Sequence, residues 1–167
     1  FLPLSHAEFK FFQKISETQG SFDADLNAGD DLGESITRLG DLDLDGIPDI
    51  AVTAEDDDDG GSNRGAVYIL FMNADGTVGN FQKISQTVGG FTGHLDNEDE
   101  FGNWVTALGD VDGDGITEIA VSAIGDDDGG INRGAIWILF LNRDGTVEHH
   151  QKISSAQGGF SGAIDNE

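Results

Sequence analysis

The chain has 167 residues, enough to bury a hydrophobic core, and carries 32 Asp and Glu against 8 Lys and Arg, a formal charge of -24. Binding a nucleic-acid backbone requires clustered cations, so this balance argues against a nucleic-acid partner. Cysteine is absent, which excludes disulfides and thiolate metal sites, and no apolar run reaches the roughly 18 to 20 residues of a membrane span. Cation binding and solubility at high salt remain as explanations of the acidity, because compact apolar runs such as residues 66–71 argue against disorder.

An internal repeat organises the chain. The segment Phe12-Gln13-Lys14-Ile15-Ser16 returns at residues 81–85 and, with His150 in the first place, at residues 150–154, so the period is 69 residues. Between residues 12–80 and 81–149, about 40 of the 69 aligned pairs are identical. Identity at this level indicates a tandem array of one structural unit.

Gly and Asp clusters divide each period into four strand candidates, and no segment has a helical period with caps. In chain order, we expect an N-terminal segment (1–33), a first unit (34–87), a linker (88–102), a second unit (103–156) and the start of a third repeat (157–167). The N-terminal segment contains an orphan strand of the fourth type at 9–16 and a linker. The strands of the first unit are expected at 35–39, 49–53, 65–72 and 78–85, and those of the second unit at 104–108, 118–122, 134–141 and 147–154.

The turns favour antiparallel hairpins. Asp75-Gly76 and Asp144-Gly145 each stand between two apolar runs, which is a strong hairpin signal for the third and fourth strands. We therefore predict an all-β fold of β-propeller blades, each a four-stranded antiparallel sheet. The alternative is a β-helix or open solenoid, whose repeats are usually shorter than about 30 residues. Two blades cannot close a ring, which needs at least about four, so the ring is incomplete in this chain.

Two acidic loops carry the clearest chemical signal. Residues 41–49 and 110–118 both place carboxylates at loop positions 1, 3 and 5, a Gly at position 6, and a carboxylate at position 9. This matches the first three quarters of a calcium loop, in which position 7 gives its backbone carbonyl. The predicted Ca²⁺ ligands are Asp41, Asp43, Asp45, Ile47 and Asp49 in the first loop, and Asp110, Asp112, Asp114, Ile116 and Glu118 in the second.

These loops depart from the EF-hand at position 12. Val52 and Val121 stand where an EF-hand has its bidentate Glu, and the residues around them read as a strand. The pattern therefore indicates a calcium loop in a β setting, with the ninth-position carboxylate in the bidentate role. A solvated acidic turn is the structural alternative, but two copies keep both the spacing and the Gly.

At this point the chain resembles the FG-GAP repeats of integrin α-subunits. Leu32-Gly33 and Phe101-Gly102 stand at the FG position, residues 53–55 and 122–124 stand at the GAP position, and the loops between them are similar to that family's DxDxDGxxD loop. The resemblance covers nearly the whole chain. It implies a closed ring of seven blades with calcium on one face of the blade. Both GAP triplets are degenerate, and Glu118 replaces the family's Asp.

A second acidic run follows the second strand of each unit, at Asp56–Asp59 and Asp126–Asp128. Charge runs of this kind are usually solvated loops. The alternatives are a second cation site and a cation-bridged contact between molecules. Arg64 and Arg133 close these loops, and we expect each to pair with a nearby carboxylate.

Function is expected to lie in binding rather than in catalysis. No nucleophile elbow, P-loop or zinc-protease motif is present, although a carboxylate pair for glycoside hydrolysis stays possible. Tyr68 and Trp137 share one slot of the third strand, where packing is favoured over sugar stacking, while the role of Trp104 is open. The histidines form no ligand spacing, and we expect them at the surface.

We therefore expect an extracellular, calcium-binding adhesion or self-assembly module, secreted or on the cell surface and without enzymatic activity. Its partners are further repeats of a longer chain or other copies joined by strand exchange, with a cell-surface protein or polysaccharide as a further possible ligand. The alternative function is an accessory propeller of a secreted carbohydrate- or lipid-active enzyme.

Overall fold

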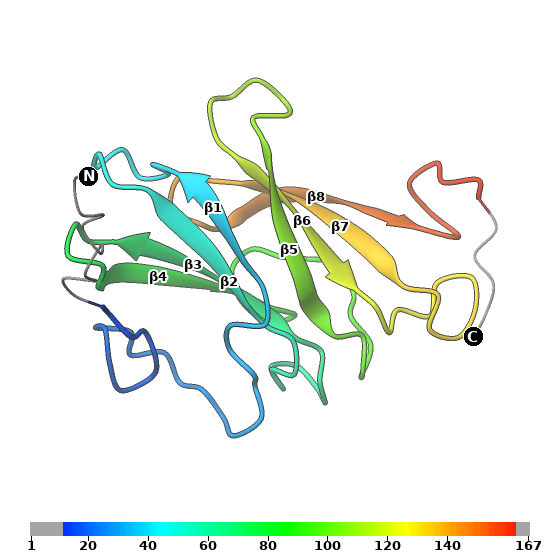
Figure 1. The fold of residues 1–167 in the computed structure, drawn as a ribbon. Coiled ribbons are helices and arrows are strands. Elements are labelled where there is room, and N and C mark those ends of the chain that lie inside the picture. The colour runs from blue at the N-terminus through cyan, green and yellow to red at the C-terminus, as the bar shows by residue number, and fades with distance from the viewer. Residues whose placement is uncertain (1–11, 163–167) are drawn as a thin grey trace, which may run out of the picture.

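The computed structural model describes residues 12–162 and contains two four-stranded antiparallel sheets (Figure 1). Each sheet follows chain order, β1-β2-β3-β4 in blade 1 and β5-β6-β7-β8 in blade 2. The strands are β1 Ile36–Gly40, β2 Asp49–Ala54, β3 Ala66–Met72, β4 Val78–Ile84, β5 Phe101–Gly109, β6 Glu118–Ala123, β7 Ala135–Leu141 and β8 Val147–Ser154. Over the described residues, no helix has the length and hydropathy that a membrane span needs. The predicted all-β blades are confirmed, and the two sheets do not close a ring.

The expected strands agree with the observed ones to within a residue or two, except that β5 begins three residues earlier than expected, at Phe101. The Asp-Gly hairpins are confirmed as well. In the first, the Asn73 N–H donates to the Thr77 carbonyl at 2.8 Å, and the Thr77 N–H donates to the Asp75 carboxylate at 3.0 Å. Gly76 has a φ of 81°, a conformation that favours glycine.

The main hydrophobic core lies between the two sheets. Figure 1 shows β1 and β5 side by side where the sheets meet. Val67, Ile69 and Ile84 of blade 1 pack in one buried cluster with Val121 and Leu139 of blade 2. Blade stacking is therefore what buries this face of blade 1.

The segment before each first strand belongs to the blade that follows it. Phe22 packs edge-on against Tyr68 at 5.6 Å between ring centroids, and Phe91, 69 residues later, packs the same way against Trp137 at 5.0 Å. Within the expected linker 88–102, Phe91 is buried, so this segment forms part of the blade interface. Part of the expected orphan strand lies outside the described residues, and its described end forms one isolated bridge, between Ser16 and Gln19.

Candidate metal centre

The two predicted calcium loops lie at equivalent places in the two blades. Residues 41–48 connect β1 with β2, and residues 110–117 connect β5 with β6. Each loop leaves a first strand and enters a second strand of the same hairpin, so the sheet fixes both of its ends. The loops therefore occupy the same end of each blade.

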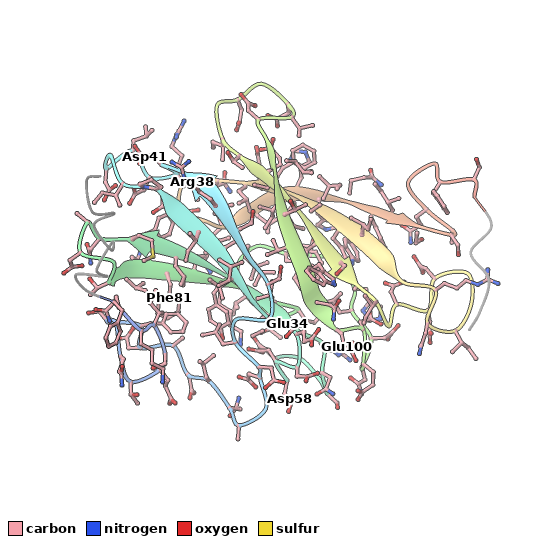
Figure 2. All side chains as sticks on the ribbon, in the orientation of Figure 1. Glu34, Arg38, Asp41, Asp58, Phe81 and Glu100 are labelled. Carbon is pink, nitrogen blue, oxygen red and sulfur yellow. The ribbon has the colours of Figure 1, made fainter. Side chains whose placement is uncertain are left out.

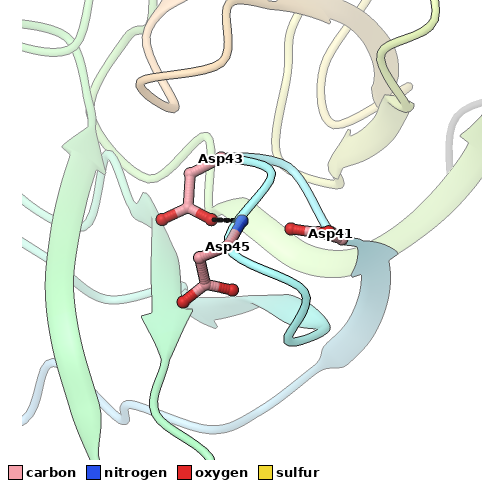
Figure 3. Close-up of side chains that lie close together, drawn as sticks. All are labelled: Asp41, Asp43 and Asp45. Carbon is pink, nitrogen blue, oxygen red and sulfur yellow. Dashed lines mark hydrogen bonds between the residues drawn. The ribbon is translucent and has the colours of Figure 1, made fainter.

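In the first loop, the side chains of Asp41, Asp43 and Asp45 converge (Figure 3). One carboxylate oxygen from each lies within 4.8 Å of the others, and all three residues are exposed. Backbone N–H groups hold them in place: that of Asp45 donates to Asp43 Oδ1 at 3.1 Å, and that of Gly46 donates to Asp41 Oδ2 at 3.0 Å. Ile47, the predicted carbonyl ligand, donates its N–H to Asp45 Oδ1 at 2.7 Å.

Asp49, the predicted ninth-position ligand, lies apart from this cluster. It is buried, and its two carboxylate oxygens accept hydrogen bonds from the backbone N–H groups of Leu42, at 2.8 Å, and Met72, at 3.0 Å. Burial raises the pKa of Asp49, while these two hydrogen bonds oppose the rise. In this conformation, Asp49 ties the loop to β3.

The second loop gathers a different set of three. Asp110, Asp112 and Glu118 each bring one carboxylate oxygen within 4.8 Å of the others. Asp114 donates its N–H to Asp112 Oδ1 at 3.1 Å and accepts the Ile116 N–H at 2.7 Å, as its counterpart does in blade 1. Glu118 is buried and accepts the Val111 N–H at 2.5 Å. Its side chain is longer than that of Asp49 and also joins the carboxylate cluster of its own loop, whereas Asp49 does not join the cluster of the first loop.

The electrostatics of the second loop favour a bound cation. Burial raises the pKa of Glu118, the bond from Val111 opposes the rise, and the charges of Asp112, Asp114 and Asp110 add to it. Carboxylates this close repel one another, and a cation among them reverses the sign of that interaction. Calcium takes six to eight oxygen ligands, so three carboxylates fit it once backbone carbonyls and water supply the rest. Both clusters are compatible with this ion.

In the second acidic runs, by contrast, the carboxylates pair with the ammonium group of a lysine from the fourth strand of the same blade. Lys83 from β4 pairs with Asp57 at 2.9 Å, and Lys152 from β8 pairs with Asp126 at 2.6 Å. The expectation for Arg64 is wrong: its guanidinium donates to the amide oxygen of Asn97 at 3.0 Å, across the blade interface. The sequence held one signal for these ion pairs, the lysine of the recurring Gln-Lys-Ile-Ser segment. With only 8 Lys and Arg for 32 Asp and Glu, a lysine that recurs at the same place of each repeat is a candidate partner for the acidic run.

The aromatic side chains are structural where packing was expected. Tyr68 and Trp137 are both buried, in equivalent slots of β3 and β7. His150 is half-buried, and the centroid of its ring lies 5.1 Å from that of Trp137. It is therefore not the surface residue that the sequence suggested, and burial lowers its pKa. Trp104 is exposed on the open face of blade 2.

Comparison with known proteins agrees with this geometry. The family model described as FG-GAP repeat matches residues 33–70 and 101–139. Integrin alpha-2 of Mus musculus is 35% identical over 95 residues, which is 56% of this chain and 8% of that protein. Integrin alpha-5 of Xenopus laevis is 39% identical over 102 residues, which is 61% of this chain and 9% of that protein. Integrin alpha-4 of Xenopus laevis is 33% identical over 92 residues, which is 54% of this chain and 8% of that protein.

The matched part of the chain thus spans less than a tenth of the length of these relatives. The two matched segments are separated by nearly the same interval as the internal repeat, and each begins at the glycine or phenylalanine of the predicted FG position. Each also covers most of the first three strands of one sheet. Residues 33–70 and 101–139 are therefore FG-GAP repeats of the integrin α type, and each forms most of one propeller blade.

Proposed function

We propose that this chain is a calcium-binding repeat module of an extracellular β-propeller that acts in adhesion or assembly. One observation carries the proposal: at the same end of both blades, three carboxylates converge within 4.8 Å around a loop with calcium-loop spacing. Extracellular calcium modules bind with dissociation constants of roughly 10⁻⁴ to 10⁻³ M. An ion held at that strength stabilises the loops in calcium-rich surroundings and leaves them when calcium is scarce.

Calorimetric titration tests the metal loops directly. Wild type is expected to bind two calcium ions per chain, one per loop, and to melt at a higher temperature with calcium than with a chelator. Asp43→Ala plus Asp112→Ala removes one ligand from each loop and is expected to abolish the binding heat and most of the melting shift. Unchanged heat and melting temperature in this double variant would refute the site.

A matched control removes the same number of charges elsewhere. Glu17→Ala plus Asp23→Ala changes two exposed carboxylates that precede β1 in the chain and belong to neither loop. This variant is expected to bind two ions like wild type. If it also loses binding, the general negative field of the chain attracts calcium and the loops do not form specific sites.

The open face of blade 2 favours another blade as the partner of this module. Ile136 is 45% exposed and Trp104 is 66% exposed there, whereas their counterparts in blade 1, Val67 and Ser35, are buried beneath blade 2. An apolar sheet face of this kind is normally covered. The covering blade comes either from further repeats of a longer chain or from another copy.

Light scattering of the chain, with calcium and with a chelator, separates these two sources. Association between copies is expected to give a mass that rises with protein concentration above the 17.7 kDa of one chain. A 17.7 kDa particle at every concentration, with or without calcium, rules out assembly between copies and leaves further repeats as the cover.

A further inference from the structure

The second acidic runs lie at the end of each blade opposite the metal loops. Figure 2 shows this in blade 1, where Asp58 of the acidic run and Asp41 of the metal loop mark opposite ends of the sheet. We call the residues 56–59 and 126–128 the far-end runs. Each far-end run carries at least three carboxylates in sequence, so a positive charge is needed there as much as in the metal loops.

The far-end runs share the local geometry of the metal loops. In the first metal loop, the Asp45 N–H donates to Asp43 Oδ1, two residues back, at 3.1 Å. In the far-end runs, the Asp59 N–H donates to Asp57 Oδ1 at 2.9 Å, and the Asp128 N–H donates to Asp126 Oδ1 at 3.0 Å. In each turn, the second oxygen of the first carboxylate takes no part in this backbone hydrogen bond and can face a cation.

In blade 1, that cation is the ammonium of Lys83. Its Nζ lies 2.9 Å from Asp57 Oδ2 and 3.4 Å from Asp59 Oδ2. The Asp57 carboxylate is buried, and the ammonium also lies 5.8 Å from the centre of the Tyr68 ring. Ser85 completes the arrangement by donating its hydroxyl to Asp59 at 2.6 Å.

Blade 2 repeats the arrangement with closer contacts. Lys152 Nζ lies 2.6 Å from Asp126 Oδ2 and 2.8 Å from Asp128 Oδ2, with the Trp137 ring centre at 5.1 Å. Ser154 donates to Asp128 at 3.0 Å, as its counterpart does in blade 1. Two blades with different aromatic residues thus place one ammonium between the same two carboxylates.

We propose that Lys83 and Lys152 are the resident cations of the far-end runs and exclude calcium from them. If the metal loops bind calcium as proposed above, each blade is held at one end by an exchangeable calcium ion and at the other by an ammonium that is part of the chain. An ammonium is a compact point charge with three donors, which suits a place between two carboxylates. The two lysines occupy the far-end runs whether or not the metal loops bind calcium.

The space around each ammonium is open enough for a metal ion to enter once the lysine is gone. A cavity of about 390 Å³ is lined by Asp57, Asp59 and Lys83, and one of about 560 Å³ by Asp126, Asp128 and Lys152. Removal of the ammonium therefore leaves two carboxylates that are accessible to solvent and stand two residues apart in the chain, as neighbouring carboxylates of the metal loops do. The inference predicts that such a variant gains a divalent-cation site.

Calorimetric titration with calcium chloride of the full 167-residue chain tests this gain. Lys152→Met keeps the length of the side chain and removes its charge, and it is expected to bind one more calcium ion per chain than its parent. Lys14→Met is the matched control, because Lys14 is the exposed lysine at the corresponding place of the first repeat and changes the net charge equally. It is expected to gain no ion.

The increment distinguishes this inference from the proposed function. A parent that binds no calcium refutes the metal loops, yet a gain of one ion in Lys152→Met still supports the resident ammonium. If Lys152→Met does not fold even in millimolar calcium, Lys83→Met is measured instead, because the Tyr68 hydroxyl keeps a donor on Asp57 at 3.2 Å. The inference is overturned if no folded lysine variant binds an additional calcium ion. It is also overturned if Asp126→Asn binds one calcium ion fewer than wild type.

Discussion

Blade 1 and blade 2 offer a comparison within one chain, because equivalent positions stand 69 residues apart. Their strands pair in the same register: Ile50 faces Leu70 in blade 1, and Ile119 faces Leu139 in blade 2. Their surroundings differ, since blade 2 covers one face of blade 1 while the corresponding face of blade 2 is open. The strand pattern thus sets the sheet, and the neighbouring blade sets what is buried.

The contacts between the blades show what the cover contributes. The Val105 N–H of blade 2 donates to the Ser35 hydroxyl of blade 1 at 3.1 Å, and Glu98 accepts hydrogen bonds from Ser62 and Asn63, at 2.8 and 3.0 Å. At the open face of blade 2, Trp104 stands in the place of Ser35. The same slot is therefore polar where a blade covers it and aromatic where none does.

Removal of the resident ammonium has the largest expected effect on stability, and its size is expected to differ between the two blades. Burial opposes the charged form of Lys152, but its hydrogen bonds to Asp126 and Asp128 outweigh burial and raise the pKa of Lys152. Lys152→Met is expected to lower the free energy of unfolding by about 3 to 5 kcal/mol, because it leaves a buried carboxylate without its cation. Urea denaturation in the presence of a chelator measures the loss.

The equivalent change in blade 1 is expected to cost less. After Lys83→Met, the Tyr68 hydroxyl still donates to Asp57, whereas Trp137 stands in that place in blade 2. We expect a loss of about 1 to 3 kcal/mol, and a larger loss for Lys83→Met than for Lys152→Met would contradict the comparison.

The next effect is a pH dependence centred on Asp99, which is buried beside the far-end run of blade 2. Burial, together with the charges of Asp126 and Asp96, raises the pKa of Asp99 to about 6, although the Asp96 N–H and Lys152 oppose the rise. Between about pH 4 and pH 6 the folded chain therefore binds a proton that the unfolded chain has lost. Stability from this group is present at low pH and falls as the pH rises through that window.

Asp99→Asn removes this dependence and keeps an oxygen to accept the Asp96 N–H. Relative to wild type, the variant is expected to become more stable as pH rises from 4 to 7, by about 2 to 3 kcal/mol in total. Chemical denaturation at half-unit pH steps measures the difference. Parallel stability curves for the two proteins would show that Asp99 ionises without cost.

The smallest expected effect lies in the metal loops, at the fourth loop position, where blade 1 has Leu44 and blade 2 has Gly113. Leu44 has a φ of 68° and Gly113, its counterpart, a φ of 88°. A left-handed conformation costs a non-glycine residue about 1 to 2 kcal/mol. We expect Gly113→Leu to destabilise the chain by about that amount and Leu44→Gly to stabilise it by up to about 1 kcal/mol, since added chain entropy offsets part of the gain.

Thermal unfolding in the presence of a chelator compares the two variants without bound calcium. Leu44 is exposed, so little packing is lost with it. Among the described residues, apart from the chain neighbours of Gly113, no atom lies within 4 Å of the place that a side-chain Cβ would take there. Changes of the same sign in the two variants would mean that turn strain is not what separates the loops.

The sequence by itself determined the repeat, the eight strands and the two acidic loops. These features depend on local chemistry: alternation and apolar runs between turn residues give strands, and Asp-Gly pairs give hairpins. The approach of Asp41 to Asp43, and of Asp110 to Asp112, follows from their spacing in one turn. Such short-range features repeat whenever the residues repeat.

Only the tertiary structure decided which charges meet across the sheet. Lys83 lies more than twenty residues from Asp57 in the chain and reaches it because β4 returns beside β3, so residue spacing gave no reason to prefer it over Arg64. Asp49 and Glu118 share a position in the repeat, yet side-chain length separates their places relative to the clusters. Contacts of this kind depend on how strands and blades stack, which is a property of the packed chain rather than of any one segment.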